Sequence, residues 1–217
     1  MNIYEISMKS YNLKKMKHFY TNILQMELIV EEEHIFSVMA GTTRLNFERD
    51  FQQPYYHLCL RTNESYFDKM YEILKGMNIL LENEAGETSL FWKGKQMYFT
   101  DPDGNVLEIL ERDYHYKGAV PFGWFDIGEI GIPSSSVKDF RHELAPLVPD
   151  QIKEIKSENF AFYGDEQGVF VLVREGRCWY PTQRPASIHP LKITISGERS
   201  LNWNHPTLPY SIKIKPI

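Results

Sequence analysis

Apolar and polar residues alternate along most of this chain in short runs, and two longer stretches have helical spacing. Helices are expected over 13–24, with Asn12 as the cap, and over 64–76, with a stop at Gly76. Strands in the same half are expected at 2–8, 26–32, 35–40, 43–49, 56–62, 79–84, 96–100 and 105–111. The pattern therefore predicts a strand, a helix and several strands, in that order and twice over.

The same order begins again after residue 120. The stretch from Glu5 to His18 aligns without gaps on the stretch from Glu129 to His142, and both read as a strand, a polar cap and a helix. The segment 112–124 contains two glycines and a proline and is the expected boundary between the halves. Further strands are expected at 151–156, 159–164, 168–174, 191–196 and 210–215. Almost no room for a helix remains between the last two, so the fourth unit is predicted to lack one.

The stretch Asp101-Pro-Asp-Gly-Asn-Val-Leu-Glu108 reads as a tight turn between two strands, followed by a carboxylate in an apolar run. Pro102 presets φ, Gly104 tolerates a positive φ, and the aspartates can bond backbone amides. Glu108 is harder to explain, because burying an unpaired carboxylate costs several kcal/mol. We expect its partner to be a cation.

Composition narrows the class of protein. The chain has 217 residues, of which 42% are hydrophobic, and a formal net charge of -5. An acidic balance argues against a nucleic-acid partner, since phosphate binding usually needs a basic face. No stretch approaches the roughly 18 apolar residues of a membrane span, and Cys59 and Cys178 are too few for a disulfide framework. The expectation is a soluble, cytoplasmic protein with free thiols.

Several motifs together resemble the vicinal oxygen chelate superfamily. They are the Glu5-Ile-Ser-Met opening, the His18-Phe-Tyr helix, the Met26-Glu-Leu that follows it, and the Asp101–Glu108 ending. This superfamily includes glyoxalase I, fosfomycin-resistance and bleomycin-resistance proteins, and extradiol dioxygenases. The resemblance implies an α+β fold in which two βαβββ modules form a cupped sheet that holds a divalent metal.

The resemblance covers most of residues 1–112 and recurs weakly over 125–217. It implies tandem βαβββ modules that form two cupped half-barrels, one from each of these ranges. The first is expected to carry a metal site. The second is expected to be degenerate, with a last module that lacks its helix.

Carried over position by position, the resemblance implies that Glu5, His57 and Glu108 ligate the metal. Asn46 is the nearest match for a fourth ligand on the strand at 43–49. Most members carry His at the first position, so Glu5 is a departure. An oxygen-rich set favours Mn²⁺, Mg²⁺, Ni²⁺ or Zn²⁺ over iron.

The repeat register sets Glu129 opposite Glu5, Lys192 opposite His57, and Lys213 opposite Glu108. Two lysines and one glutamate cannot hold a divalent cation. One active cup is therefore expected, in the first half of the chain.

The chemistry implied by the resemblance is that of a metal-dependent lyase or isomerase of glyoxalase type. Its substrate would be a small oxygenated molecule, with Glu5 and Glu108 as the catalytic carboxylates and Glu5 the better base. One alternative is a metal-free binding protein of the bleomycin-resistance type, in which Glu108 pairs with Arg44 or Lys95. A third is a ring-cleaving dioxygenase of extradiol type. Both a monomer and a homodimer remain open.

Overall fold

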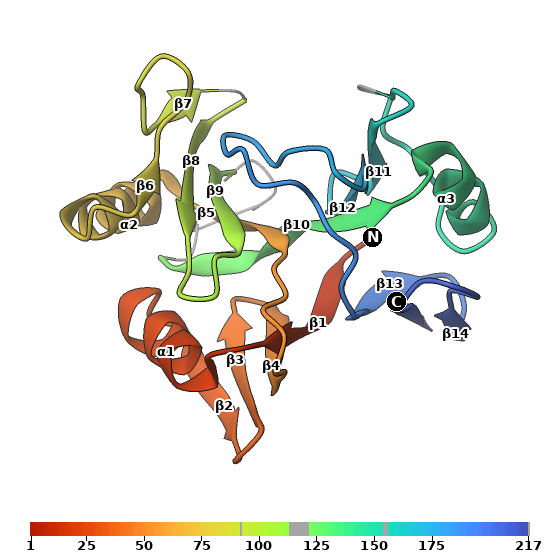
Figure 1. The fold of residues 1–217 in the computed structure, drawn as a ribbon, viewed down its shortest axis with the longest axis horizontal. Helices are drawn as coiled ribbons and strands as arrows, with labels where there is room; N and C mark the ends of the chain where they lie inside the picture. Colours follow the sequence, from red (N-terminus) through yellow and green to blue (C-terminus); the bar gives the residue numbers. More distant parts are fainter. Residues whose placement is uncertain (92, 113–121, 154–155, 217) are drawn as a thin grey trace.

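The chain folds into two curved sheets with helices packed beside them (Figure 1). The computed structural model describes residues 1–91, 93–112, 122–153 and 156–216. The strands and helices follow the predicted order of modules. Because the predicted boundary segment 112–124 falls mostly on 113–121, most of that segment lies outside the described residues.

Sheet A has seven strands in the order β14-β15-β13-β1-β4-β3-β2. The strands are β1 (Ile3–Ser10), β2 (Glu27–Glu31), β3 (Ile35–Ala40), β4 (Thr43–Arg49), β13 (Leu191–Gly197), β14 (Leu201–Asn204) and β15 (Tyr210–Pro216).

Sheet B has eight strands in the order β11-β12-β10-β5-β9-β8-β6, with β7 paired to β8. The strands are β5 (His57–Thr62), β6 (Leu80–Leu81), β7 (Leu90–Phe91), β8 (Lys95–Thr100), β9 (Val106–Glu111), β10 (Trp124–Ser134), β11 (Phe160–Asp165) and β12 (Gly168–Arg174).

Each predicted helix in the first half is present, and the cap prediction for Asn12 is confirmed. The helices are α1 (Leu13–His18), which continues as a π-helical turn over Phe19–Ile23, α2 (Glu64–Gly76) and α3 (Val137–Leu144). The side chains of Asn12, Asn63 and Ser136 accept backbone N–H groups in the first turns of α1, α2 and α3.

Each sheet takes strands from both halves of the chain. The first module lies in sheet A with the fourth, through antiparallel pairing of β1 with β13. The second module lies in sheet B with the third, through antiparallel pairing of β5 with β10. Each cup therefore contains strands from both of the predicted domains, 1–112 and 125–217.

Two strand predictions were wrong in the third and fourth modules. Residues 151–153 form no strand, since the Gln151 N–H donates to the Gly164 carbonyl and the Ile152 N–H donates to the Asp150 side chain. The short edge strand β14 was missed, because two of its four residues are asparagine. The expectation of a fourth module without a helix is confirmed over the described residues 191–216.

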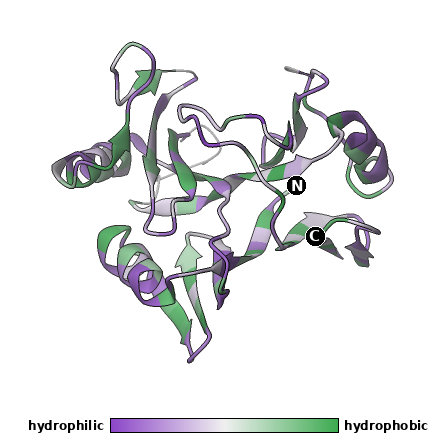
Figure 2. Ribbon diagram, in the orientation of Figure 1, coloured by the Kyte–Doolittle hydropathy of each residue, from purple (hydrophilic) through white to green (hydrophobic). Residues whose placement is uncertain are grey.

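Alternation of apolar and polar residues gives each sheet one face in the core. On β5, Leu58 and Leu60 point into the core, while His57, Cys59 and Arg61 lie on the opposite face. Figure 2 shows apolar stretches along the central strands, and helices that carry both apolar and polar residues. One large apolar cluster joins residues of both sheets and all three helices.

The Asp101–Asn105 turn ties the second module to the first. As predicted, its aspartates bond backbone amides: Asp101 accepts N–H groups from Asp103 and Asn105. Asp103, which is only 1% exposed, accepts the N–H groups of Tyr11 and Asn12 as well as the Ser10 hydroxyl. The turn therefore supports the start of α1 as well as joining β8 to β9.

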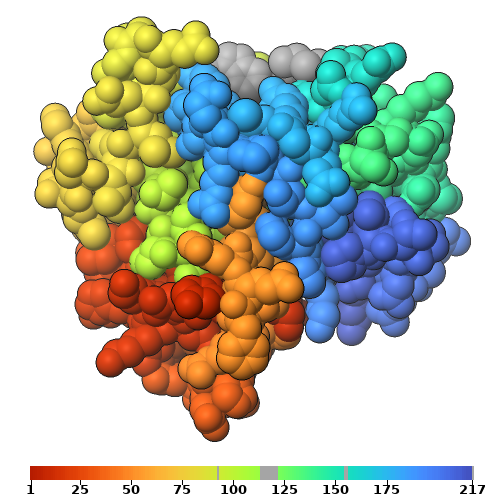
Figure 3. Space-filling view, in the orientation of Figure 1, coloured from red at the N-terminus to blue at the C-terminus, as the bar shows by residue number. Residues whose placement is uncertain are grey.

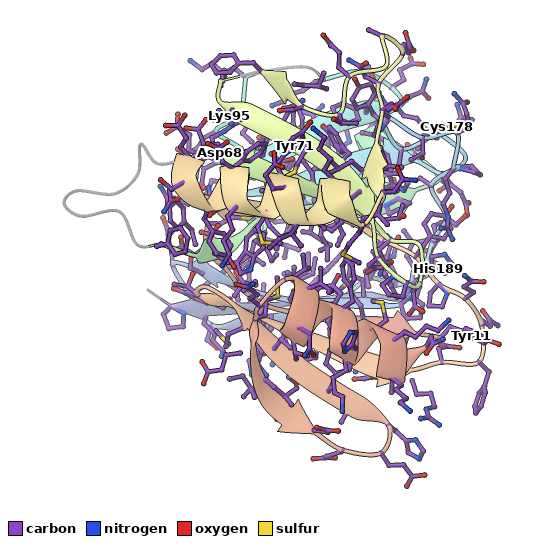
Figure 4. The ribbon with its side chains drawn as sticks, turned by 90° about the vertical axis from the view of Figure 1, so that its left-hand side faces the viewer. Tyr11, Asp68, Tyr71, Lys95, Cys178 and His189 are labelled. Atoms are coloured by element: carbon purple, nitrogen blue, oxygen red, sulfur yellow. The ribbon has the colours of Figure 1, made fainter. Side chains whose placement is uncertain are left out.

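We expect replacement of Asp103 by alanine to lower the free energy of unfolding by about 2–4 kcal/mol, because it leaves buried donors unpaired. Urea unfolding checks this. Asp68→Ala is the matched control, since Asp68 is an exposed residue of α2 that pairs with Lys95 (Figure 4). This substitution should lower the free energy of unfolding by less than about 0.5 kcal/mol. Equal losses in the two variants would contradict the role assigned to the turn.

Candidate active site

The polar face of sheet B carries a row of ionisable groups at its centre. Glu108 on β9 and Glu129 on β10 both lie beside Cys59 of β5, one on each side. Tyr98 on β8 lies next to Glu108 in the same row. His57 is two residues from Cys59 on β5 and therefore faces the same side. We call this face the active cup.

His57 and Glu108 are directed toward each other within the cup. The imidazole Nδ1 lies 3.0 Å from the Val106 carbonyl, to which it donates, so that Nε2 carries the free lone pair. Nε2 is 3.9 Å from Glu108 Oε2. The Tyr98 hydroxyl donates to Glu108 Oε1 at 2.9 Å and fixes the carboxyl group.

Burial in the cup shifts the pKa values of His57, Glu108 and Glu129 in the directions that favour their neutral forms. Burial lowers the pKa of His57 to about 4, so the ring is neutral near pH 7. Burial, together with the neighbouring charge of Glu129, raises the pKa of Glu108 well above its ordinary value. Burial also raises the pKa of Glu129, while Arg112 and Arg61 oppose the rise. Two carboxyl groups thus lie in a place that water solvates poorly.

Two cavities open onto these side chains. The smaller one, of about 140 Å³, is lined by His57, Glu108 and Glu129 together with aromatic residues that include Tyr98 and Trp179. The larger one, of about 720 Å³, also has Glu129 in its wall. It is further lined by cationic, amide and acidic side chains, namely Arg61, Lys93, Arg112, Lys153, Gln151, Gln167, Asp165 and Glu166. Glu129 therefore lines both cavities.

The structure brings together His57 and Glu108 of the predicted ligand set and places Glu5 elsewhere. Glu5 lies on β1 of sheet A, where its Oε1 accepts from Asn46 Nδ2 at 2.7 Å. Asn46 also bonds Ser7 and Ser37, so the expected fourth ligand belongs to the same polar network of sheet A. Glu5 is therefore removed from the centre that His57 and Glu108 share.

Glu129 was not among the predicted site residues, yet it lines the small cavity together with His57 and Glu108. The repeat register set it opposite Glu5, and in the structure it stands beside Glu108 where Glu5 was expected. Lys192 and Lys213, which the repeat register grouped with Glu129, lie on β13 and β15 of sheet A instead. Each cup thus combines positions from two modules that are not in the same half of the chain.

Neither proposed cation partner of Glu108 is close to it. Arg44 bonds Asn46 and Ser37 in sheet A, and Lys95 pairs with Asp68 and Glu64 beside α2. Among the aromatic residues near these strands, Tyr98 lines the small cavity, whereas Phe47 lies in the core.

The donor chemistry of the active cup suits a divalent cation. Two carboxylates and a neutral imidazole, whose Nδ1 donates to a carbonyl, form a common kind of ligand set. In the part of the chain that the structure describes, no group of three His, Cys, Asp or Glu side chains is arranged to hold an ion as it stands. His57, Glu108 and Glu129 would have to draw closer together to share one.

Comparison with known proteins identifies similar sequences and folds. Residues 10–109 match the model of the Glyoxalase/Bleomycin resistance protein/Dioxygenase superfamily. A metallothiol transferase FosB of Lysinibacillus sphaericus (strain C3-41) is 33% identical over 128 residues, which cover 53% of this chain and 89% of that protein.

Two solved structures share the fold over nearly the whole chain. A proposed dioxygenase from Bacillus subtilis subsp. subtilis strain 168 has a TM-score of 0.64 at 14% identity, covering 99% of this chain and 85% of that one. A glyoxalase I variant from Zea mays has a TM-score of 0.59 at 12% identity, covering 99% and 93%. No helix in the described residues is long and apolar enough to cross a bilayer.

We expect the His57 ring in chelator-treated protein to stay neutral down to about pH 5, because its pKa is lowered to about 4. The unfolded chain binds this proton below about pH 6.5, so the unfolded state holds more protons between these values. His57 therefore makes the free energy of unfolding fall as the pH falls through that window, and His57→Gln should weaken that fall. Ring ¹⁵N shifts and urea unfolding at pH 7 and pH 5 check this. A His57 ring that protonates above pH 6 would contradict it.

Proposed function

Since this chain belongs to the glyoxalase/bleomycin resistance protein/dioxygenase superfamily, we propose that it is a metal-dependent lyase or isomerase of glyoxalase type. Its substrate would be a small oxygenated molecule bound in the active cup. The observation that carries the proposal is the grouping of His57, Glu108 and Glu129 around a cavity of about 140 Å³. Buried carboxyl groups with perturbed pKa values in a cavity are typical of functional sites.

His57, Glu108 and Glu129 would hold the metal in this proposal, with Glu129 in place of Glu5. A bound divalent cation supplies Lewis-acid stabilisation of a developing oxyanion. Mn²⁺, Mg²⁺, Ni²⁺ and Zn²⁺ fit the oxygen-rich set better than iron does. This assignment disfavours a ring-cleaving dioxygenase, whose iron is typically bound by two histidines and one carboxylate.

The two carboxyl groups have different surroundings and so suit different roles. Glu108 is 6% exposed and is held by the Tyr98 hydroxyl, which restricts its carboxyl group. Glu129 is half-buried and faces both cavities. Glu129 is thus the less restrained of the two carboxyl groups and the one that can leave the metal. Once released, its carboxylate would carry proton transfer at the substrate.

The cavities indicate how a substrate would lie. The reacting oxygens would face His57 and Glu108 in the small cavity, while a larger substituent would extend past Glu129 into the cavity of about 720 Å³. The many polar groups in that second cavity suit a charged or amide-bearing substituent. Free thiols at Cys59 and Cys178 agree with a cytoplasmic setting.

Thiol transfer is the second candidate reaction. The Lysinibacillus sphaericus relative, 33% identical, is named a metallothiol transferase. Fosfomycin with a low-molecular-weight thiol would test this reaction through loss of free thiol. The hemithioacetal of methylglyoxal would test the isomerase reaction through formation of the thioester. The products thus separate two functions that would use the same centre.

We expect protein purified without chelator to bind about one divalent cation per chain, and Glu108→Gln and Glu129→Gln to weaken Mn²⁺ binding about tenfold or more. Titration calorimetry with Mn²⁺ checks both. Glu5→Gln is the matched control, because Glu5 lies in sheet A, and it should keep wild-type affinity.

Two outcomes would overturn this assignment. Metal content below about 0.1 equivalent in the wild type would favour the metal-free binding protein, since a resident cofactor needs near-stoichiometric occupancy. Loss of Mn²⁺ binding in Glu5→Gln with retention in Glu129→Gln would restore the ligand set expected from the sequence.

A further inference from the structure

The segment 175–190 links β12 of sheet B to β13 of sheet A and crosses the active cup on its way (Figure 1). We call it the strap. Figure 3 shows it in blue, lying across the front of the molecule over the strands of the second module. Trp179 and Ala186 of the strap belong to an apolar cluster with Tyr98, Val106, Val171 and Val173 of sheet B. The strap is therefore packed onto the cup.

An arginine fastens the strap to the Asp101–Asn105 turn. Arg184 Nη1 donates to the Gly104 carbonyl at 2.6 Å, and its guanidinium lies 3.6 Å from the centre of the Tyr55 ring. A Cβ on Gly104 would come within 2.2 Å of Arg184 Nη1, so the glycine makes this approach possible. Within the strap, the Trp179 N–H donates to the Arg184 carbonyl. The anchor is thus connected directly to Trp179.

Trp179 covers one face of the His57 ring. The two rings stack with centroids 4.8 Å apart and an interplanar angle of 25°, and Trp179 is only 4% exposed. Gly131 on β10 provides the space, because a Cβ there would lie 2.6 Å from Trp179 Cη2 and 3.0 Å from His57 Cβ. The indole occupies a slot between the imidazole and the strand that carries Glu129.

We propose that Trp179 is a positioning residue that holds the His57 ring with Nε2 facing Glu108. The Val106 carbonyl fixes the ring at Nδ1 only, and a single hydrogen bond leaves the ring plane free to rock about that point. The stacked indole removes this freedom. The strap then contributes a residue to the centre in addition to Glu129 of β10, and this inference rests on the proposed function.

Trp179→Leu, Trp179→Phe and the wild type should be compared by Mn²⁺ titration calorimetry and by ¹⁵N NMR of the His57 ring in metal-free protein. We expect Trp179→Leu to weaken Mn²⁺ binding about tenfold, as loss of a group that orients a ligand does. Its His57 ring N–H signal should broaden or disappear. Trp179→Phe should stay within about threefold of wild type, because a phenyl ring can still stack.

Trp203→Leu is the matched control, since it removes an indole that contacts His205 in sheet A, outside the active cup. It should leave both measurements unchanged. Gly131→Ala provides a second test that retains every site side chain, because the added Cβ would press on both the Trp179 indole and His57 Cβ and so disturb their stacking. It should weaken Mn²⁺ binding as Trp179→Leu does.

Wild-type Mn²⁺ affinity together with an unchanged His57 ring signal in Trp179→Leu would overturn the positioning role. Failure of the proposed function is a different result, namely a wild type that binds no Mn²⁺. In that case the ring signal alone decides, and an unchanged signal in both Trp179→Leu and Gly131→Ala would overturn the inference.

Discussion

The antiparallel pairing of β5 with β10 is the contact on which the arrangement of this molecule depends. It places the third module beside the second, so the fourth module completes the sheet of the first. Glu129 reaches Glu108 only through this pairing, since the two residues flank Cys59 on opposite sides. The same pairing leaves Glu5 in sheet A with Asn46, in a hydrogen-bonded network rather than beside a cavity wall of the cup.

The Asp101–Asn105 turn links the stability of the fold to the site. On one side Asp103 accepts backbone groups at the start of α1, and on the other the Gly104 carbonyl receives Arg184 of the strap. The carbonyl of Val106, which follows the turn, accepts a hydrogen bond from His57 Nδ1. Each of these bonds joins segments far apart in the sequence and uses a backbone N–H or C=O group, and such groups need partners when a protein folds. The connection between β8 and β9 thus also holds the start of α1, the strap and the His57 ring.

Local sequence predicted much of the fold, because strand and helix periods depend on neighbouring residues. The helices at α1 and α2, the Asn12 cap, the aspartate–amide bonds and the helix-free fourth module all followed from such patterns. The absence of a strand at 151–153 and the presence of the edge strand β14 did not follow from local patterns, since both depend on tertiary pairing. For the site, the resemblance predicted His57 and Glu108 by position, and the structure brings these two side chains together. Glu129 was not, because repeated modules present equivalent edges and local patterns do not say which edges pair.

Assembly of each cup from two different modules has a consequence for how the chain can change over time. In a symmetric pair of identical subunits, any substitution appears in both cups at once. In this single chain, the modules that form sheet A vary independently of those that form sheet B. Lys192 and Lys213 lie on the sheet A strands at the positions that correspond to His57 and Glu108, and lysines at those two positions would abolish a metal centre in the active cup. Covalent linkage therefore lets one cup carry lysines while the other carries acidic and imidazole groups.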